Sequence, residues 1–205
     1  IYKVSDGAFD PTVGPSVKAW GFKEDKFNAL DSATVDSILQ FTSFEQGIVF
    51  NLENSQDSVW QDTITVIKNF DQARLDFNAI AQGYAVDVIY DYLEKSGAEN
   101  FYVYIGGEVR VKGTNSEGND WRIGVDKPVV ENDGNTPRQL APSVIHIRDQ
   151  AIATSGNYRK YYEKDGVVYV HTLNPKTGYP ITHQLLSATI VANTAAIADA
   201  VATVF

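Results

Sequence analysis

The chain has no cysteine, which excludes a disulfide framework, thiolate catalysis and cysteine-ligated metal sites. It also has no apolar run of about 18 residues that could cross a membrane, and no basic segment followed by an apolar stretch opens it. Positive charge is scarce, because 17 lysine and arginine residues face 26 acidic ones. The net charge of -9 leaves no basic surface for phosphate backbones, so we expect no nucleic-acid partner.

What the chain does have is enough apolar material for a full core. Its 205 residues are 43% apolar and 12% aromatic, which predicts one domain with two lobes. A phosphate-bearing ligand on so acidic a protein would need backbone N–H groups, a helix N-terminus or a cation. The chain starts at Ile1 without an initiator methionine and stops at Phe205 in a helix-like run, so we expect it to be incomplete at both termini.

Helices and strands mix without a regular βαβ alternation, which predicts an α+β fold with largely antiparallel sheets and packed helices. In the loop expected at 7–21, Pro11 and Pro15 argue against a regular helix. A polar turn is expected at 54–57 and a polar loop at 126–142. Hydrophobic periodicity predicts helices at 33–40, 81–93 and 194–205, and strands at 47–52, 58–68, 101–105, 121–125, 144–148, 167–170 and 187–191.

The sharpest chemical signal is the pair of Asp199 and Thr203 on the last predicted helix. A spacing of four places the carboxylate and the hydroxyl on one face, one turn apart. Both are oxygen ligands of the kind that hold Mg²⁺ beside substrate phosphates and waters. The alternative is a solvated aspartate with a threonine that bonds a backbone carbonyl.

Residues 75–85 place Asp76 at the expected end of a strand and small residues just before the clearest helix. The helix N-terminus would favour an anion, and Asp76 could accept hydrogen bonds from a ligand. The alternative is that Asp76 and Asn78 cap the helix.

Two further segments could bring main chain close to a ligand. Gly106 and Gly107 follow a predicted strand, and glycine there would let a bulky ligand meet the backbone. Thr154 and Ser155 lie in a cluster of small hydroxyl residues at 153–157, which could bind phosphate or form an ordinary turn.

His171 is one of three histidines, and it lies directly after a predicted strand and before a turn-rich segment. Its imidazole titrates near neutral pH, which suits removal of a proton from an acceptor hydroxyl. A structural role is the alternative. His146, within a strand, and His183, in a loop, are weaker candidates.

In order and sequence these segments resemble the ApbE family of FAD:protein FMN transferases, once described as thiamine biosynthesis lipoproteins. The resemblance spans nearly the whole chain. It is carried by residues 7–15, 75–87, 104–110, 153–158, 171–180 and 198–203.

The resemblance implies a Mg²⁺-dependent transfer in which FAD donates FMN to a threonine hydroxyl and AMP is released. The magnesium would be held by the Ala79 carbonyl, Asp199 and Thr203. Asp199 and His171 would be the catalytic residues, with His171 activating the acceptor. The residues implied or expected to contact FAD are Ala8, Phe9, Asp10, Asp76, Gln82, Gly106, Gly107, Thr154, Ser155 and Leu173.

The acceptor implied by the resemblance is a flavinylated protein, typically a subunit of a membrane redox system. The implied location is the periplasm or cell envelope, with a lipid anchor in the full-length form. Gln82, Asn174 and Glu108 depart from the pattern of the family. Alternatives are an FAD pyrophosphatase that releases free FMN, a flavin carrier without catalysis, and a purely structural domain.

Overall fold

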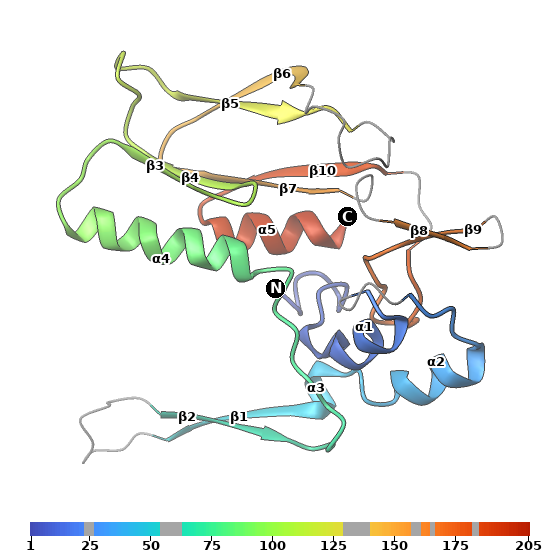
Figure 1. Cartoon of the computed structure of the whole chain (residues 1–205). Coiled ribbons are helices and arrows are strands. Elements are labelled where there is room, and N and C mark those ends of the chain that lie inside the picture. The colour runs from blue at the N-terminus through green and yellow to red at the C-terminus, as the bar shows by residue number, and fades with distance from the viewer. Residues whose placement is uncertain (23–26, 54–62, 129–139, 157–160, 165–166, 182–184) are drawn as a thin grey trace. The chain divides into compact units, whose positions relative to one another are not determined.

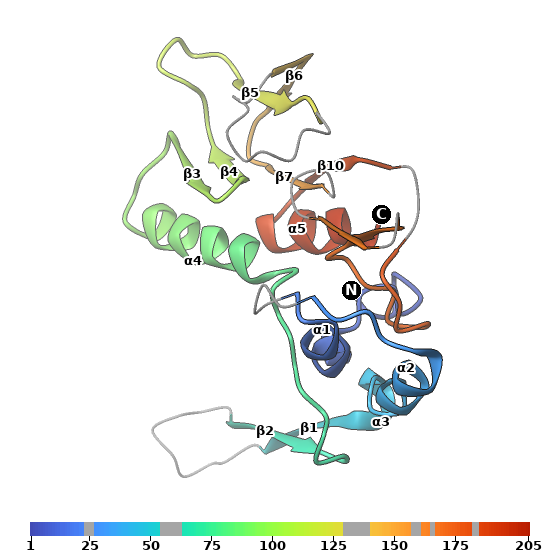
Figure 2. The same cartoon turned by 45° about the vertical axis from the view of Figure 1, so that its right-hand side comes forward.

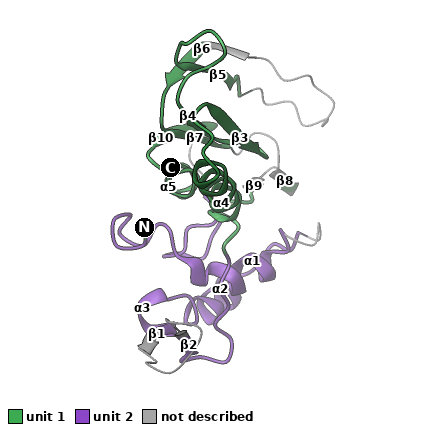
Figure 3. Cartoon of the chain, turned by 90° about the vertical axis from the view of Figure 1, so that its left-hand side faces the viewer, with its two compact units in different colours: residues 1, 77–172, 182–205 green, residues 2–76, 173–181 purple. Residues whose placement is uncertain are grey.

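The computed structural model describes the chain except residues 23–26, 54–62, 129–139, 157–160, 165–166 and 182–184. The described residues divide into two compact units (Figure 3). Unit 1 comprises residue 1, 77–172 and 182–205, and unit 2 comprises 2–76 and 173–181. No helix in the described part of the chain is long and apolar enough to cross a membrane.

Unit 1 is built on an antiparallel sheet of four strands in the order β10-β7-β4-β3. Two helices, α4 and α5, cover one face of this sheet (Figures 1 and 2). The bounds are β3 Phe101–Ile105, β4 Glu108–Lys112, β7 Ala151–Gly156, β10 Ser187–Ala192, α4 Ala81–Lys95 and α5 Ala195–Val204.

Apolar side chains pack on both faces of the sheet. On the helix face, Val86 and Tyr90 of α4 pack with Val103, Ala151 and Ala195. On the other face, buried side chains of the sheet pack against the hairpin of β5 (Trp121–Asp126) and β6 (Leu140–Ile147). Unit 1 therefore has three layers, with the sheet in the middle. A separate hairpin joins β8 (Tyr161–Lys164) to β9 (Val167–Val170).

Strand β4 shows how alternation directs charge toward the helices. Val109 and Val111 belong to the apolar cluster on the β5–β6 side, so Glu108, Arg110 and Lys112 point to the opposite face, where α4 and α5 lie. The turn that leads into β4 consists of Gly106 and Gly107, with φ of 67° and 140°. Positive φ at both central residues of a tight hairpin strongly favours glycine.

Unit 2 contains short helices and one two-stranded hairpin. The side chain of Trp20 is only 2% exposed, and its Nε1 donates to the Gly178 carbonyl at 2.8 Å, which attaches the segment 173–181 to this unit. The elements are η1 Pro11–Val13, α1 Gly14–Trp20, α2 Ser32–Leu39, α3 Phe44–Gly47, β1 Ile48–Glu53 and β2 Thr63–Lys68.

The structure confirms the α+β fold, the antiparallel sheet and the predicted helices to within a few residues. The expectation that residues 7–21 lack a helix was wrong. Pro15 lies in the first turn of α1, where its missing N–H costs no intrahelical hydrogen bond. The turn predicted at 54–57 and residues 58–62 of a predicted strand lie outside the described residues.

Other boundaries also differ from the sequence-based expectations. The loop predicted at 126–142 is too long, because β6 already begins at Leu140. Residues 151–156 form β7 in the interior of the sheet, so the turn reading of the hydroxyl cluster was wrong. Asp76 follows an irregular segment and not a strand, since β2 ends at Lys68.

Candidate functional site

The predicted site residues divide between the two units, and each group is described within its own unit. Unit 1 carries the predicted metal ligands and the candidate base, and unit 2 carries the remaining residues expected to contact FAD. The members in unit 1 are Ala79, Gln82, Gly106, Gly107, Thr154, Ser155, His171, Asp199 and Thr203, and those in unit 2 are Ala8, Phe9, Asp10, Asp76 and Leu173.

In unit 1, Asp199 of α5 reaches the N-terminus of α4. The first N–H groups of a helix have no partner within the helix, and the N-cap residue of α4, Ile80, provides no side-chain hydrogen bond. The Gly83 N–H instead donates to Oδ2 of Asp199 at 2.9 Å. At least one N–H group at the start of α4 thus has its acceptor on α5, and the capping role of Asp76 and Asn78 stays an alternative.

The close approach of α4 and α5 explains why residue 83 is glycine. A Cβ on Gly83 would stand 2.3 Å from the Ala195 carbonyl oxygen, closer than any real contact. This approach brings the Asp199 carboxylate to the helix end, and Asp199 is 8% exposed. Burial raises the pKa of Asp199, and the hydrogen bond from Gly83 partly opposes this shift.

A second buried carboxylate, that of Glu108, lies in the same region and was not predicted as a site residue. Glu108 is 6% exposed, and its Oε2 has no hydrogen-bond partner in the described part of the chain. This oxygen lies 3.4 Å from the position that a Cβ on Gly106 would take, and the Gln82 amide occupies the same spot. Burial and the negative charge of Asp199 raise the pKa of Glu108 to about 7.

These residues fit a hard divalent cation such as Mg²⁺. Asp199 and Glu108 share a buried region. Among the described residues, no histidine and no further acidic side chain joins these two. Neutral oxygens would then complete the shell, as is usual for Mg²⁺. The Thr203 hydroxyl donates to the Asp199 carbonyl oxygen at 3.2 Å, which leaves the hydroxyl lone pairs available. Ala79 is half-buried in the turn before α4.

Two predicted hydroxyl residues, Thr154 and Ser155, lie on β7, which packs against α5. Ser155 and Thr203 both line a small cavity of about 10 Å³, together with Thr172 and Phe205. The Thr154 hydroxyl is hydrogen-bonded to that of Thr189 on β10, at 2.9 Å. The structure therefore brings two predicted residues, Ser155 and Thr203, to one cavity.

His171 follows β9 directly, as predicted, and its side chain is exposed. An exposed imidazole is accessible to a hydroxyl on another protein, as a base for a protein acceptor must be. Its catalytic role stays a prediction.

In unit 2, two predicted FAD-contacting segments lie together. The Asp76 N–H donates to the Pro11 carbonyl at 2.6 Å, next to Asp10. The Asp10 carboxylate accepts hydrogen bonds from the Thr12 N–H at 2.8 Å and from the Phe44 N–H at 3.2 Å. The Asp10 carboxylate thus caps the start of η1 and holds this loop to the N-terminus of α3.

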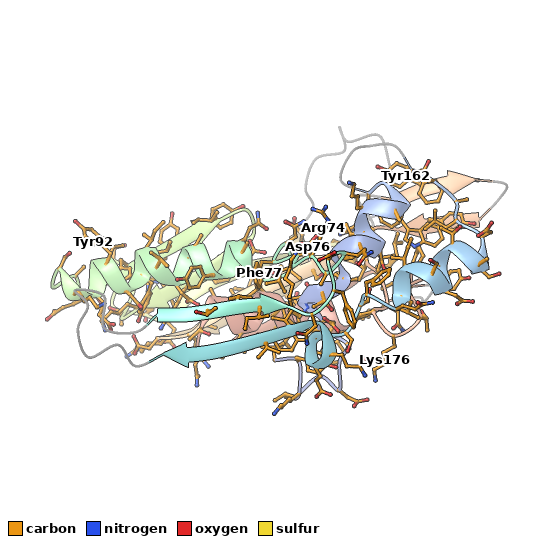
Figure 4. All side chains as sticks on the ribbon, turned by 90° about the horizontal axis from the view of Figure 1, so that it is seen from below. Arg74, Asp76, Phe77, Tyr92, Tyr162 and Lys176 are labelled. Atoms are coloured by element: carbon orange, nitrogen blue, oxygen red, sulfur yellow. The ribbon has the colours of Figure 1, made fainter. Side chains whose placement is uncertain are left out.

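Ala8 is exposed and Phe9 half-buried beside this loop, while Leu173 is buried and pairs with Pro180 in an isolated bridge. A groove of about 390 Å³ runs along the same loop, within the size range of small-molecule sites. Asp10 lines it, as do Asp6 and Lys176, which form an ion pair at 2.6 Å. Asp76 and Lys176, labelled in Figure 4, both belong to unit 2.

The pKa of Glu108 gives the first testable prediction. In metal-free protein the folded state holds a proton on Glu108 up to about pH 7, whereas the unfolded state releases it near its ordinary value of 4.5. This stabilisation is complete below the unfolded pKa and is lost as the pH rises through the folded pKa. We therefore expect the Tm in EDTA to fall between about pH 5 and about pH 8, and Glu108→Gln to reduce that fall. Equal pH profiles in the two proteins would contradict the assignment.

Comparison with known proteins assigns the family. The model of the ApbE family matches residues 1–205. The chain is 38% identical over 200 residues to the FAD:protein FMN transferase of Vibrio cholerae serotype O1, covering 98% of the chain and 55% of that protein. It is 36% identical over 203 residues to the protein of the same name from Haemophilus influenzae, covering 99% and 56%.

Solved structures agree with the sequence comparisons. The apo form of the Pseudomonas stutzeri flavinyl transferase ApbE superposes with a TM-score of 0.76 at 30% identity, covering 99% of this chain and 58% of that one. The ApbE protein of Thermotoga maritima gives a TM-score of 0.79 at 31% identity, covering 99% and 60%. The chain spans little more than half the length of the curated relatives it matches. On the family match and these similarities, the chain belongs to the ApbE family.

Proposed function

We propose that this chain forms the greater part of a magnesium-dependent transferase, which cleaves FAD and attaches its FMN half to a threonine hydroxyl of a partner protein. The observation that carries the proposal is the buried Asp199 at the N-terminus of α4, found in a chain whose relatives are named FAD:protein FMN transferase. An ionised, buried Asp199 carboxylate and the diphosphate of FAD are both anionic, so each needs a counter-charge.

The proposed reaction exchanges one phosphorus–oxygen bond for another. The threonine oxygen forms a bond to the phosphorus of the FMN half, the bond from this phosphorus to the bridging oxygen breaks, and AMP leaves with the electron pair. A bound divalent cation supplies neutralisation of the diphosphate charge. The acceptor hydroxyl must also lose its proton, and exposed His171 is our candidate to accept it.

The remaining predicted residues have supporting roles in this proposal. Asp76 and Asp10 lie on adjoining segments of unit 2, and Asp10 lines a groove large enough for part of a dinucleotide. Ser155 and Thr203 meet at one small cavity of unit 1. Hydroxyl groups and main-chain N–H groups can bind phosphate oxygens without a basic surface, which suits a chain with a net charge of -9.

The identity of the acceptor is part of the proposal. The relatives' name implies a protein that receives FMN, and we propose a threonine-bearing subunit of a membrane redox system. We further propose that the full-length protein works in the periplasm or cell envelope, held by a lipid anchor.

Mass spectrometry of an acceptor tests this function. The protein, expressed with any residues that flank this chain in nature, would be incubated with FAD, Mg²⁺ and a threonine-bearing acceptor subunit. We expect the acceptor to gain the mass of FMN, and AMP to appear in equal amount. Free FMN with an unmodified acceptor would instead make the protein an FAD pyrophosphatase, and intact FAD would leave only a binding protein.

The same assay tests the base. We expect His171→Ala to lower the rate of FMN transfer by about 10²- to 10⁴-fold, the usual contribution of general base catalysis. His146→Ala is the matched control, since His146 is also exposed but lies on β6, and it should leave the rate unchanged. Full activity of His171→Ala would remove this residue from the reaction.

A further inference from the structure

Strand β4 carries a row of charged side chains that face the helices of unit 1. Lys112 forms an ion pair with Glu94 of α4. Two residues earlier, Arg110 donates from Nη1 to Oδ1 of Asp87, also on α4, at 2.8 Å. At these two positions of the row, a basic group on the strand therefore meets an acidic group on a helix.

At the third position of the row, an acidic residue of the strand meets an acidic residue of a helix. Glu108 lies two residues before Arg110 on the same face of the strand, and the charge that acts on it most is that of Asp199 on α5. Both carboxylates are more than nine-tenths buried. Neither has a basic side chain as an ion-pair partner among the described residues.

The unpaired oxygen of Glu108 points into this same region. Oε2 is buried and accepts no hydrogen bond from the residues that the structure describes, and it lies close to Gly106 and the Gln82 amide at the start of α4. The neighbouring residue, Gly83, donates to Asp199. A buried carboxylate oxygen without a partner is costly, and a second carboxylate beside it adds to the cost. Among the described residues, no positive charge balances these two carboxylates.

We infer that Glu108 is a second carboxylate of the divalent-cation site, which holds the cation together with Asp199. This inference rests on the proposed function, since that function places the cation at Asp199. It adds a residue that the predicted ligand set of Ala79, Asp199 and Thr203 does not contain. The cation then supplies at the third position of the row the positive charge that Arg110 and Lys112 supply at the other two.

This assignment also gives a reason for glycine at residue 106. A Cβ there would stand 2.3 Å from the Gln82 Nε2 and 3.4 Å from the Glu108 Oε2. A side chain at this position would therefore push on both the Gln82 amide and the Glu108 carboxylate. The glycine turn therefore leaves room for the Gln82 amide and the Glu108 carboxylate at the start of α4.

Titration of Mn²⁺ followed by electron paramagnetic resonance tests the inference directly, because free and bound Mn²⁺ give different signals. The probe is Mn²⁺ alone, added to the protein without FAD or acceptor, and Mg²⁺ is then added as competitor. We expect Glu108→Gln to weaken Mn²⁺ binding by at least about 10-fold, since loss of even an outer-shell partner costs about 10- to 100-fold, and Glu108→Asp to retain a measurable part of the affinity. Glu94→Gln, which removes one negative charge at the other end of the row, should bind like the parent protein.

Thermal unfolding separates loss of a ligand from loss of the fold. Saturating Mn²⁺ should raise the Tm of the parent protein, because a ligand that binds only the folded state stabilises it. In Glu108→Gln this rise should shrink, while the Tm in EDTA stays equal or increases, since an unpartnered carboxylate has been removed. A Tm in EDTA that falls in Glu108→Gln would mean a structural role and overturn the inference.

The outcomes distinguish the inference from the function on which it rests. Parent-like Mn²⁺ affinity in Glu108→Gln, with binding lost in Asp199→Asn, would refute the role of Glu108 and leave the proposed metal site standing. No Mn²⁺ binding by the parent protein, with FMN transfer intact, would refute both the role of Glu108 and the magnesium dependence.

Discussion

Replacement of Asp199 with asparagine is expected to abolish most FMN transfer while the protein stays folded. The asparagine side chain keeps an oxygen that can accept the hydrogen bond which Gly83 donates at 2.9 Å, so the N-terminus of α4 remains capped. What is lost is the negative charge for a cation. We expect a fall in the transfer rate of about 10²- to 10³-fold, the usual effect of removing one group that stabilises charge in the transition state.

The measurement is the initial rate of FMN attachment to the acceptor, followed by mass spectrometry over a range of Mg²⁺ concentrations. Unfolding in EDTA should show an equal or higher Tm for Asp199→Asn, because the repulsion between residues 199 and 108 is relieved. Asp120→Asn is the matched control. Asp120 is a partly exposed aspartate of the same unit, in an ion pair with Arg148, and its replacement should change neither rate nor metal dependence.

This measurement would also show whether Asp199 and Thr203 bind a metal or have a structural role only. The structure shows the hydrogen bond from the Thr203 hydroxyl to a backbone carbonyl that the alternative reading expected. It also shows that Asp199 is buried, not solvated. Retention of full transfer activity by Asp199→Asn, at every Mg²⁺ concentration, would support a structural role for the pair.

The elements that the sequence predicts well are those whose pattern is local. Residues 81–93 carry apolar side chains at helical spacing, and α4 occupies 81–95. The apolar run at 101–105 is β3, with the same bounds. Such elements depend on which face of the segment is buried, and the sequence shows this directly.

Strand β4 was not predicted, although its residues alternate between apolar and charged. Only Val109 and Val111 are apolar in its five residues, and the other face carries Glu108, Arg110 and Lys112. Such alternation is typical of a strand, but the sequence does not show that the charged face turns toward the helices, where Arg110 and Lys112 meet acids far away in the chain. The partners at 87, 94 and 199 cannot be assigned from spacing.

The candidate site was predictable in part for the same reason. Asp199 and Thr203 are neighbours on one helix turn, so their spacing alone suggests a site. Glu108 comes from another element, and its burial near Asp199 follows from the packing of α5 against the sheet. A sign in the sequence was available: an acidic residue directly after a glycine pair that ends a buried strand.

Replacement of Asp87 with alanine is expected to destabilise the fold more than any surface change. The Asp87 carboxylate accepts hydrogen bonds from the Ala195 and Ala196 N–H groups, both at 2.9 Å, at the start of α5. It also pairs with Arg110 at 2.8 Å, and both side chains are mostly buried. Alanine would leave a buried guanidinium with only the distant, exposed Asp91 carboxylate as an ion-pair partner, and two helix N–H groups without an acceptor, which costs about 3 to 5 kcal/mol of unfolding free energy.

Denaturant unfolding followed by circular dichroism measures this change. Asp91→Ala is the matched control, because Asp91 lies one turn further along α4 and approaches Arg110 only to 3.7 Å with a side chain that is 54% exposed. An exposed pair of this kind contributes about 0 to 1 kcal/mol. A loss in Asp87→Ala no larger than in Asp91→Ala would contradict the buried network.

A double variant separates the two costs of losing Asp87. Arg110 also stacks on Tyr90, with its guanidinium carbon 3.8 Å from the ring centre, so it does not depend on Asp87 alone. In Asp87→Ala with Arg110→Met, the poorly paired buried charge is gone but the two helix N–H groups still lack their acceptor. We expect the double variant to regain part of the stability lost in Asp87→Ala. Asp87 binds the start of α5, and Asp199 of α5 binds the start of α4. Loss of the Asp87 carboxylate should therefore also displace Asp199, and the affinity of the protein for the cation should fall.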